Sequence, residues 1–362
     1  MKKIAYIMHY VTNGGPSNVV KNIVYNLERQ MYQPILITLF KGNDPQIIYE
    51  YKKKGIQVIE CNYDSKIKVL LGKNHLKDIL IREKIDIAHS HGFVCDILLS
   101  RMTNKKIPRI STVHSNIFQD YVYTYGKVKA AIIIPLYIYF LNKMDRVILC
   151  SKYALELLSR YVKRCEYVYN GIDDTNVCNS ISRDELGIRE DEKIFIYVGG
   201  LRAVKNVSGL IELFCLHSKK NEHLLIVGDG EEKNTCRKLA NERVHFLGYK
   251  EDPIPYMSIS DCFISASFSE GMPMAVLEAL DNGLPLVLSN IPAHEEIFEI
   301  YSSQYIGELF SKNTFAKCMQ NFRDNFSIIS SEEIIKTKKQ FFSSINMVEK
   351  YSCVYESVKN LL

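Results

Sequence analysis

The apolar residues of this chain gather in short runs that alternate with longer amphipathic stretches. In the first half, β-rich runs are expected to form strands at Lys3–Met8, Pro34–Phe40, Ile56–Glu60, Ile85–His89, Arg109–Val113 and Arg146–Cys150. The pattern restarts after residue 190, with expected strands at Lys193–Val198, His223–Val227, Arg243–Leu247, Asp261–Ser265 and Pro285–Ser289. Helix-length segments separate many of these runs, which is typical of βαβ units in a parallel sheet. The chain is therefore expected to be an α/β protein with two doubly wound domains in series.

The polar stretch from Asp173 to Asp191 separates the two sets of strands, because Asp, Asn and Ser outnumber apolar residues there. We expect an N-terminal Rossmann-like domain over residues 1–175 and a C-terminal one over residues 176–343. The length of 362 residues agrees with this division at roughly 150 residues per domain. Ligands of doubly wound sheets bind at the carboxyl ends of the strands, so the residues directly after each strand are the first candidates for a site.

Composition and cysteine spacing exclude several classes of protein. Hydrophobic residues make up 47% of the chain and charged residues 24%, as in folded globular proteins rather than disordered or fibrous ones. The ten cysteines stand singly, without a Cys-x-x-Cys pair, so we expect reduced thiols in a cytoplasmic protein. His89 and His91 have no carboxylate or cysteine beside them to complete a metal site, and none is expected.

The longest apolar run extends from Ala130 to Leu141 and contains Pro135. It is shorter than the roughly 20 residues that span a bilayer, so no transmembrane segment is expected. We expect a buried helix there. A membrane-surface element is the alternative, because Tyr137 and Tyr139 suit either environment.

The net charge of +5 conceals an asymmetry between the two halves. Residues 1–170 carry 26 Lys and Arg against 13 Asp and Glu, whereas residues 171–362 carry 20 against 28. Two interpretations of the basic half stay open: attraction to anionic lipid head groups or a phosphorylated acceptor, and an ordinary solvated surface. No nucleic-acid partner is expected, because the Lys residues are scattered without a recognisable nucleic-acid-binding module.

The most informative segment runs from Ser269 to Leu280 and places two carboxylates around the start of a helix. Pro273 suits the first helical position, and Gly283 is expected to end the helix in a left-handed conformation. Glu270 then lies beside free N–H groups at the positive end of the helix dipole. Glu278 lies about 7.5 Å along the axis from Pro273, at ~1.5 Å per residue.

This segment resembles the Glu-x7-Glu signature of the retaining glycosyltransferases of family 4, which have the GT-B fold and use nucleotide sugars. The resemblance implies two domains facing across a cleft, with the region of Glu270 at the donor sugar and Glu278 at the ribose. It also implies that residues 344–362 form a C-terminal helix that returns to the first domain.

Other landmarks of that family follow in the same order along the chain. The Asn13-Gly14-Gly15-Pro16 loop resembles the one that members place against donor phosphates and acceptor, and Thr112-Val113-His114-Ser115 matches the site of a His that faces the reacting sugar. After the strand ending at Val198, the family usually has Gly-Arg and a Lys five residues later. Lys205 fits, but Gly200 occupies the Arg position, and Arg202 is the candidate substitute.

The resemblance implies transfer of a sugar, with retained anomeric configuration, from a nucleotide diphosphate sugar to a hydroxyl of a saccharide acceptor. UDP-hexose or UDP-N-acetylhexosamine is the expected donor, and a lipid-linked acceptor in cell-surface polysaccharide synthesis (capsule or O-antigen) is expected because the chain is similar to bacterial surface-polysaccharide transferases. The enzyme is expected to need no metal or other cofactor and to lie in the cytoplasm, with peripheral contact at the inner membrane face.

The expected catalytic residues are His114, Lys205 and Glu270, and the expected donor-binding residues are Gly14, Gly15, Gly200, Arg202, Lys205, Gly228, Gly271, Met272, Pro273, Met274 and Glu278. Two alternatives stay open. One is a noncatalytic nucleotide-sugar-binding subunit of a transferase complex, which the missing Gly-Arg motivates; the other is a GT-B-like sugar-nucleotide epimerase.

Overall fold

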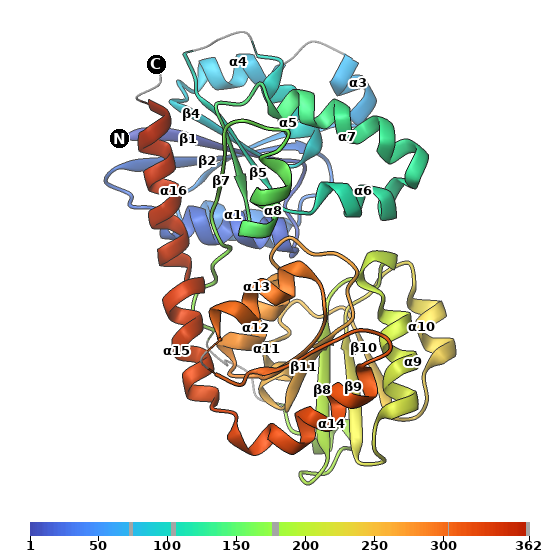
Figure 1. The fold of residues 1–362 in the computed structure, drawn as a ribbon. Helices are drawn as coiled ribbons and strands as arrows, with labels where there is room; N and C mark the ends of the chain where they lie inside the picture. The colour runs from blue at the N-terminus through green and yellow to red at the C-terminus, as the bar shows by residue number, and fades with distance from the viewer. Residues whose placement is uncertain (72–74, 103–105, 176–180, 303, 360–362) are drawn as a thin grey trace. The chain divides into compact units, whose positions relative to one another are not determined.

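The computed structural model describes residues 1–71, 75–102, 106–175, 181–302 and 304–359, which fold into two compact units (Figure 1). The first unit comprises Met1–Asp173 and the chain from Ser344 onward; the second comprises Asp174–Ser343. The observed division after Asp173 precedes the one expected after residue 175. Residues 176–180, which include Cys178 and part of the expected junction, lie outside the described residues.

The first unit is built on a seven-stranded parallel sheet of order β3-β2-β1-β4-β5-β6-β7. The strand order reverses at β1, so the topological switch point lies between β1 and β4, where doubly wound sheets bind ligands. The strands are β1 (Lys2–Met8), β2 (Tyr32–Phe40), β3 (Gln57–Tyr63), β4 (Ile87–His91), β5 (Arg109–Val113), β6 (Arg146–Leu149) and β7 (Cys165–Tyr167).

Helices connect these strands, and the C-terminal helix belongs to the same unit. Side-chain oxygens of Asp44 and Ser151 cap the first N–H groups of α2 and α8, as expected for such residues before a helix. The helices are α1 (Gly15–Asn26), α2 (Pro45–Lys53), α3 (Lys66–Leu71), α4 (His75–Arg82), α5 (Phe93–Ser100), α6 (Ile117–Tyr125), α7 (Lys127–Leu141), α8 (Lys152–Leu158) and α16 (Ser344–Lys359).

The second unit repeats the plan with a six-stranded parallel sheet of order β10-β9-β8-β11-β12-β13, whose switch point lies between β8 and β11. The strands are β8 (Lys193–Val198), β9 (Glu222–Val227), β10 (Val244–Gly248), β11 (Cys262–Ser265), β12 (Leu286–Ser289) and β13 (Gly307–Phe310). The helices are α9 (Val207–His217), α10 (Lys233–Leu239), α11 (Ile254–Ser258), α12 (Met274–Asp281), α13 (Pro292–Ile300), α14 (Phe315–Asn325) and α15 (Ser331–Phe342), with short 3-10 turns at Asp184–Leu186, Ala203–Lys205 and Phe326–Ile328.

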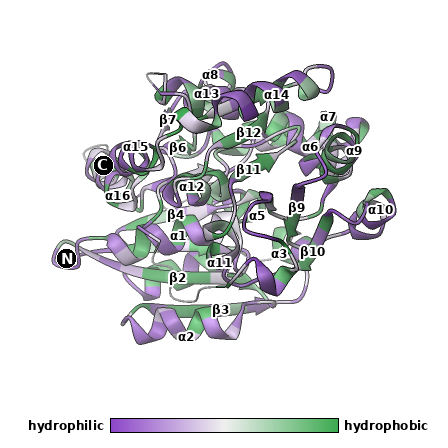
Figure 2. Ribbon diagram, turned by 90° about the horizontal axis from the view of Figure 1, so that it is seen from below, coloured by the Kyte–Doolittle hydropathy of each residue, from purple (hydrophilic) through white to green (hydrophobic). Residues whose placement is uncertain are grey.

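The central strands of both sheets are buried on both faces, and helices alternate with parallel strands, which confirms the expected α/β class. The central strands β1 and β8 are almost fully buried, and Figure 2 shows strands such as β2 and β9 mainly in the hydrophobic colour. The described helices include none that is both long and apolar enough to cross a bilayer.

Three expectations for individual elements need correction. The strand expected to end at His89 continues to His91, because the chain pairs with β1 and β5 as far as His91 and the side chains of Ser90 and His91 are buried. The short strands β7 and β13 were not expected. The helix that contains the Ala130–Leu141 run buries only part of its surface, since Ala130, Tyr137 and Leu141 are buried and the side opposite to them is exposed.

Candidate active site

The loops that follow β8 and β11 flank the switch point of the second unit and are hydrogen-bonded to each other. Phe268 N donates to the carbonyl of Val204 at 2.8 Å, and the side-chain amide of Asn206 donates to the carbonyl of Ala266 at 3.1 Å. Asn206 adopts a left-handed φ of 51°, which Asn tolerates better than most side chains. The two loops therefore form a single surface at the ligand-binding edge of the sheet.

An ion pair between Lys205 and Glu270 joins these loops. Lys205 Nζ donates to both carboxylate oxygens of Glu270 at 2.6 Å, and Ser267 Oγ donates to Oε1 at 2.7 Å. The two side chains are only 19% and 11% exposed, so water and salt screen the pair weakly. An ammonium has three N–H donors, and Glu270 takes two of them. The third can bind an anion that enters this edge.

The charge state of Glu270 follows from this arrangement. Burial alone would raise the pKa of its carboxyl, but the neighbouring Lys205 ammonium and the hydrogen bonds more than offset burial and hold the pKa below its ordinary value. Glu270 is therefore ionised at neutral pH.

His294, at the start of α13, lies beside this ion pair. Its Nδ1 is 2.8 Å from the carbonyl oxygen of Ser289, which can only accept, so Nδ1 carries the proton. Burial lowers the pKa of His294, and the opposing charges of Glu270 and Lys205 both act on the ring. The neutral ring thus presents Nε2 as an acceptor.

That acceptor is not satisfied within the described part of the chain. His294 is 0% exposed, and its Nε2 has no hydrogen-bond partner among the described residues. A buried polar atom left in this state costs roughly 1–3 kcal/mol, so such atoms mark places where a ligand can supply the partner.

Glu278 lies on α12 and has the opposite electrostatic environment from Glu270. Burial, with a smaller contribution from the carboxylate of Asp252, raises the pKa of Glu278 to about 7. Its carboxyl changes charge near neutral pH and can either donate or accept a hydrogen bond there.

The turn that precedes α12 differs from the expectation. Pro273 lies just before the helix, with extended backbone angles of −74° and 113°, and Met274 is the first helical residue. Gly271, Met272 and Pro273 form a buried turn at the helix start. Gly283 has a left-handed φ of 67°, as expected for a glycine that ends a helix.

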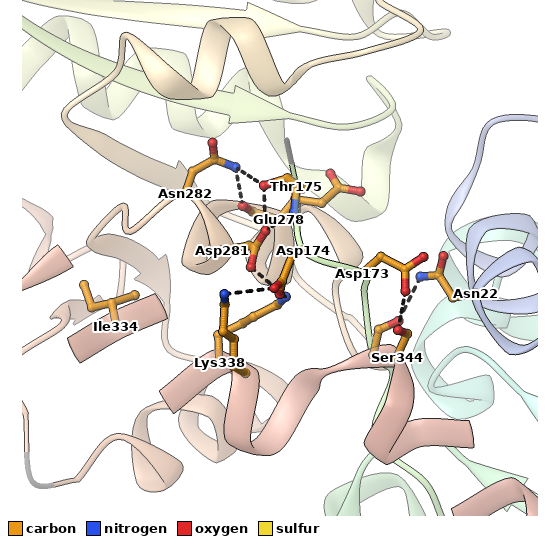
Figure 3. A network of polar contacts seen from close by, with 12 residues as sticks. Asn22, Asp173, Asp174, Thr175, Glu278, Asp281, Asn282, Ile334, Lys338 and Ser344 are labelled. Carbon is orange, nitrogen blue, oxygen red and sulfur yellow. Dashed lines mark hydrogen bonds and ion pairs between the residues drawn. The ribbon is translucent and has the colours of Figure 1, made fainter. Parts of the chain in front are cut away.

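The other end of α12 is fixed by a buried polar network (Figure 3). Lys338 of α15 is fully buried and lies 2.6 Å from Asp281 Oδ1, while Asp281 Oδ2 accepts from the backbone and hydroxyl of Thr175 at 2.5 and 2.6 Å. The Asn282 side chain donates to the Glu278 carbonyl at 2.9 Å. These contacts hold the helical turn that carries Glu278.

Glycines after β8 and β9 allow two backbone turns to touch. A Cβ on Gly228 would lie 1.9 Å from the Gly199 carbonyl oxygen, and one on Gly230 would lie 2.4 Å from that of Leu201. Gly228 was expected to make room for a nucleotide; the packing of the two turns already excludes a side chain there.

Gly200 and Arg202 lie close together, although the family usually has an Arg at the first of these positions. A Cβ on Gly200 would lie 3.5 Å from Arg202 Nε, so the guanidinium of Arg202 occupies the space above Gly200. The expected substitution of Arg202 for the family's usual Arg stays a prediction.

In the first unit, His114 follows β5 and is joined to His91 at the end of β4. Nδ1 of His91 and Nε2 of His114 are 2.9 Å apart, and the rings are stacked with centroids 5.2 Å apart. His91 is buried and His114 half-buried, and the Cys150 thiol lies 3.8 Å from His114 Nδ1.

Beneath this pair, His89 connects the sheet to α16. Its Nδ1 lies 2.9 Å from the Tyr355 hydroxyl and its Nε2 2.8 Å from Thr112 Oγ1, and the hydroxyls of Tyr355 and Tyr6 are 2.9 Å apart. The C-terminal helix therefore supplies part of the network that fixes the orientation of the histidines.

These histidines are neutral at physiological pH. Burial lowers the pKa of His89 to about 3 and that of His114 to about 4, and burial with the two neighbouring rings places the pKa of His91 well below its ordinary value. The cluster can donate and accept hydrogen bonds but carries no charge to neutralise a phosphate.

The glycine loop after β1 begins α1 at the same switch point. Gly14 is the N-cap and Gly15 the first helical residue. Thr12 N donates to Ser17 Oγ at 3.2 Å, and Asn18 N donates to the Gly14 carbonyl at 2.9 Å.

The expected site residues thus form two groups. Gly14, Gly15 and His114 belong to the first unit; the others belong to the second unit, around β8, β9, β11 and α12. Sequence reasoning missed His294 and the role of Ser267. His294 follows the expected strand Pro285–Ser289, so the rule that selected the other candidates also points to it. Among the described residues, no three His, Cys, Asp or Glu side chains gather in a way that could hold a metal ion.

Two family models match consecutive parts of the chain. The model described as Glycosyltransferase Family 4 matches residues 13–176, and that described as Glycosyl transferases group 1 matches residues 179–340. These ranges follow the two structural units.

Similar proteins are found in bacteria. The O-antigen biosynthesis glycosyltransferase WclY of Escherichia coli is 28% identical over 98% of each chain. The UDP-Gal:alpha-D-GlcNAc-diphosphoundecaprenol alpha-1,3-galactosyltransferase of Escherichia coli is 25% identical over 82% of this chain and 81% of its own. The Anabaena protein HepE, crystallised with UDP and glucose, shares the fold with a TM-score of 0.79 at 15% identity, over 99% of this chain and all of that one. The fold, the two family models and the relatives agree: this chain is a glycosyltransferase with the GT-B fold and belongs to glycosyltransferase family 4.

Proposed function

We propose that this enzyme transfers a sugar from a nucleotide diphosphate sugar to a hydroxyl of a saccharide acceptor, with retention of the anomeric configuration, in cell-surface polysaccharide synthesis. The observation that carries the proposal is the weakly screened Lys205–Glu270 pair at the switch point of the second sheet, with one ammonium donor left over.

The reaction places negative charge on the departing diphosphate, because the bond between the anomeric carbon and the phosphate oxygen breaks. The remaining N–H of Lys205 is suited to that charge, and Glu270 holds the ammonium in place before the substrate arrives. Preorganised donors of this kind are typically worth 10²–10³ in rate. Arg202, beside Gly200, is proposed as a second cation for the same group.

The backbone around α12 is proposed to bind the rest of the donor. The N–H groups of Gly271, Met272 and Met274 are proposed to face the donor at the positive end of the α12 dipole. Pro273 has no N–H and fixes the turn. Glu278 is proposed to accept hydrogen bonds from the ribose hydroxyls when it is ionised.

His294 is proposed to complete the sugar site. Its Nε2 is a buried acceptor without a described partner beside Lys205 and Glu270, and a hydroxyl of the donor sugar would satisfy it. This residue would favour donors with a hydroxyl at the matching position, because a deoxy sugar would leave the acceptor unpaired.

The first unit is proposed to act on the reacting sugar and the acceptor. His114, held by His91, contacts the reacting sugar, and the Gly14-Gly15 loop allows close approach of phosphate or acceptor. The acceptor oxygen forms the new bond on the face from which the diphosphate departs, and its proton passes to that phosphate. No metal or other cofactor is required in this scheme.

The substrate classes are proposed from the relatives. UDP-hexose or UDP-N-acetylhexosamine is the proposed donor and a lipid-linked saccharide the proposed acceptor, because one relative is named for transfer from UDP-galactose to a sugar on diphosphoundecaprenol and another for O-antigen synthesis. Such an enzyme would work in the cytoplasm, at the inner face of the membrane and in peripheral contact with it.

A panel of nucleotide sugars, scored by thermal shift and by nucleotide release with and without acceptor, tests the proposal. We expect one donor to stabilise the protein and to be turned over, and K205A and E270A to lose turnover while staying folded. Full activity of both variants would refute the assignment. Binding without turnover by the isolated wild type would favour the noncatalytic subunit, which Gly200 in place of Arg motivates, and isomerised donor would favour an epimerase.

A further inference from the structure

Helix α7 carries apolar side chains on two opposite sides. Ala130, Tyr137 and Leu141 are buried against the first unit, whereas Ile132 and Leu136 face outward. A helix that is apolar all round is normally enclosed by protein or lipid. In the described structure, one side of α7 is not covered by protein.

The exposed residues of α7 follow one another at helical spacing. Val128 is 79% exposed, Ile132 68%, Leu136 46% and Tyr139 56%, and intervals of four, four and three residues place them on a single face. Tyr125 at the end of α6 is also exposed, at 44%. We call these five residues the α7 face. Scattered exposed apolar residues are common, but a contiguous stripe marks an interaction surface.

The α7 face is held in place from behind. Tyr137 donates to the buried carboxylate of Asp96 at 2.5 Å and packs against Phe93 and Tyr121 with ring centroids 4.9 and 5.9 Å apart. Figure 1 shows α6 and α7 side by side in this unit, in agreement with their contacts. The face is therefore presented as a preformed surface.

The charged residues in the segment that carries the α7 face have one sign. Lys127, Lys129 and Lys143 flank it, and no Asp or Glu occurs between Asp120 and Asp145. Among the described residues, none of the three ammonium groups forms an ion pair; Lys143 lies 4.3 Å from the ring centre of Tyr139. Aliphatic and tyrosine side chains bordered by Lys are the composition that binds an anionic lipid surface, with the ammonium groups at the level of the head groups.

We propose that the α7 face docks the first unit onto the surface of an anionic lipid bilayer, with Ile132 and Leu136 inserted below the head groups and the three lysines against lipid phosphates. Helix α7 would lie in the interface without crossing it. This contact with the bilayer needs no donor or acceptor sugar. Its test therefore gives a result that does not depend on the outcome for the proposed transferase reaction.

Sedimentation of the purified chain with vesicles tests the proposal. We expect the wild type to bind vesicles of phosphatidylcholine with roughly one-third phosphatidylglycerol at least tenfold more strongly than vesicles of phosphatidylcholine alone, and I132E/L136E to lose at least tenfold of the binding to the anionic vesicles. The matched control is L216E/I328E, which adds the same charge at exposed apolar residues of the second unit and should bind as the wild type does.

The lysines are tested in the same way. K127Q/K129Q/K143Q should lose roughly a hundredfold of the binding to anionic vesicles, at about 1 kcal/mol for each of the three Lys at such a surface. The control K53Q/K84Q/K163Q removes three exposed lysines elsewhere in the first unit and should retain most of it. Thermal unfolding of all variants shows whether they fold. Equal vesicle binding by the wild type and I132E/L136E would overturn the proposal. So would a wild type that does not bind vesicles but dimerises through the α7 face.

Discussion

The two switch points of this enzyme have the same place in their sheets but opposite electrostatics. In the second unit, Lys205 and Glu270 form a charged pair with strong hydrogen bonds. In the first unit, His91 and His114 form a neutral pair, because burial keeps both rings uncharged. The fold therefore fixes where a ligand can bind, and the residues after the strands decide whether that place suits a phosphate or a hydroxyl.

The largest expected effect comes from removing the cation of the charged pair. We expect K205A to lower turnover by roughly 10²–10³, because the departing diphosphate loses its preorganised donor. It should also lose about 3 kcal/mol of stability, because Glu270 remains as a buried charge without its partner. Steady-state kinetics and urea unfolding measure the two effects.

A double variant separates catalysis from folding. In K205M/E270M no buried charge remains, so stability should return toward that of the wild type while turnover stays low. Recovery of turnover in this variant would contradict the assignment of Lys205.

A smaller effect is expected at the neutral pair. H114A should lower turnover by roughly tenfold, the cost of about one hydrogen bond, and should leave the affinity for free nucleoside diphosphate unchanged. Calorimetric titration and kinetics distinguish these outcomes. H75A, which removes a histidine that is exposed at the surface, is the control. A loss of nucleotide affinity in H114A equal to its loss of turnover would break the division of roles between the two units.

Glu278 provides a test by pH. Its folded pKa of about 7 lies above the ordinary value of 4.5, so between these values the folded state binds more protons than the unfolded state and stability falls as pH rises. The half-buried carboxyl should contribute about 1–2 kcal/mol to this loss. We expect E278Q to be more stable than the wild type at pH 8 and similar to it at pH 4.5, as measured by urea unfolding. If the stabilities of wild type and E278Q changed in parallel from pH 4.5 to pH 8, the pKa of Glu278 would not be raised in the folded state.

The smallest effect is expected at His294. H294F keeps the bulk of the ring but removes the Nε2 acceptor. The ratio of the affinity for the nucleotide sugar to the affinity for the free nucleoside diphosphate should therefore fall by about fivefold. Calorimetric titration of the nucleotide sugar and of the nucleoside diphosphate into wild type and H294F gives this ratio. An unchanged ratio would mean that the sugar does not contact Nε2.

Much of the fold follows from local pattern, and the exceptions share a cause. Arg109–Val113 and Lys193–Val198 were predicted with the observed bounds because each is a β-rich run with clear ends. The end of β4 was missed because Ser90 and His91 are polar in sequence but buried, and the partner of His91 Nδ1, His114, is distant in the chain.

The site was predicted in its elements but not in its connections. The order of motifs selected Lys205 and Glu270, yet nothing local indicates that one ammonium binds both oxygens of a carboxylate 65 residues later. The buried ion pair of Lys338 with Asp281 could not be predicted from the sequence either, since Lys is normally exposed. The exposed side of α7 could not be inferred, because an apolar run without polar positions does not show which side faces the protein.

Calorimetric titration of a nucleoside diphosphate and the matching monophosphate into wild type and K205A tests the role of the charged pair most directly. The wild type should bind the diphosphate at least tenfold more tightly than the monophosphate, in keeping with one charge-assisted hydrogen bond of roughly 1.5–3 kcal/mol. K205A should lose most of this preference, with Arg202 left as the other proposed cation. If K205A keeps the full preference of the wild type, Lys205 does not bind the terminal phosphate and the proposed donor site is wrong.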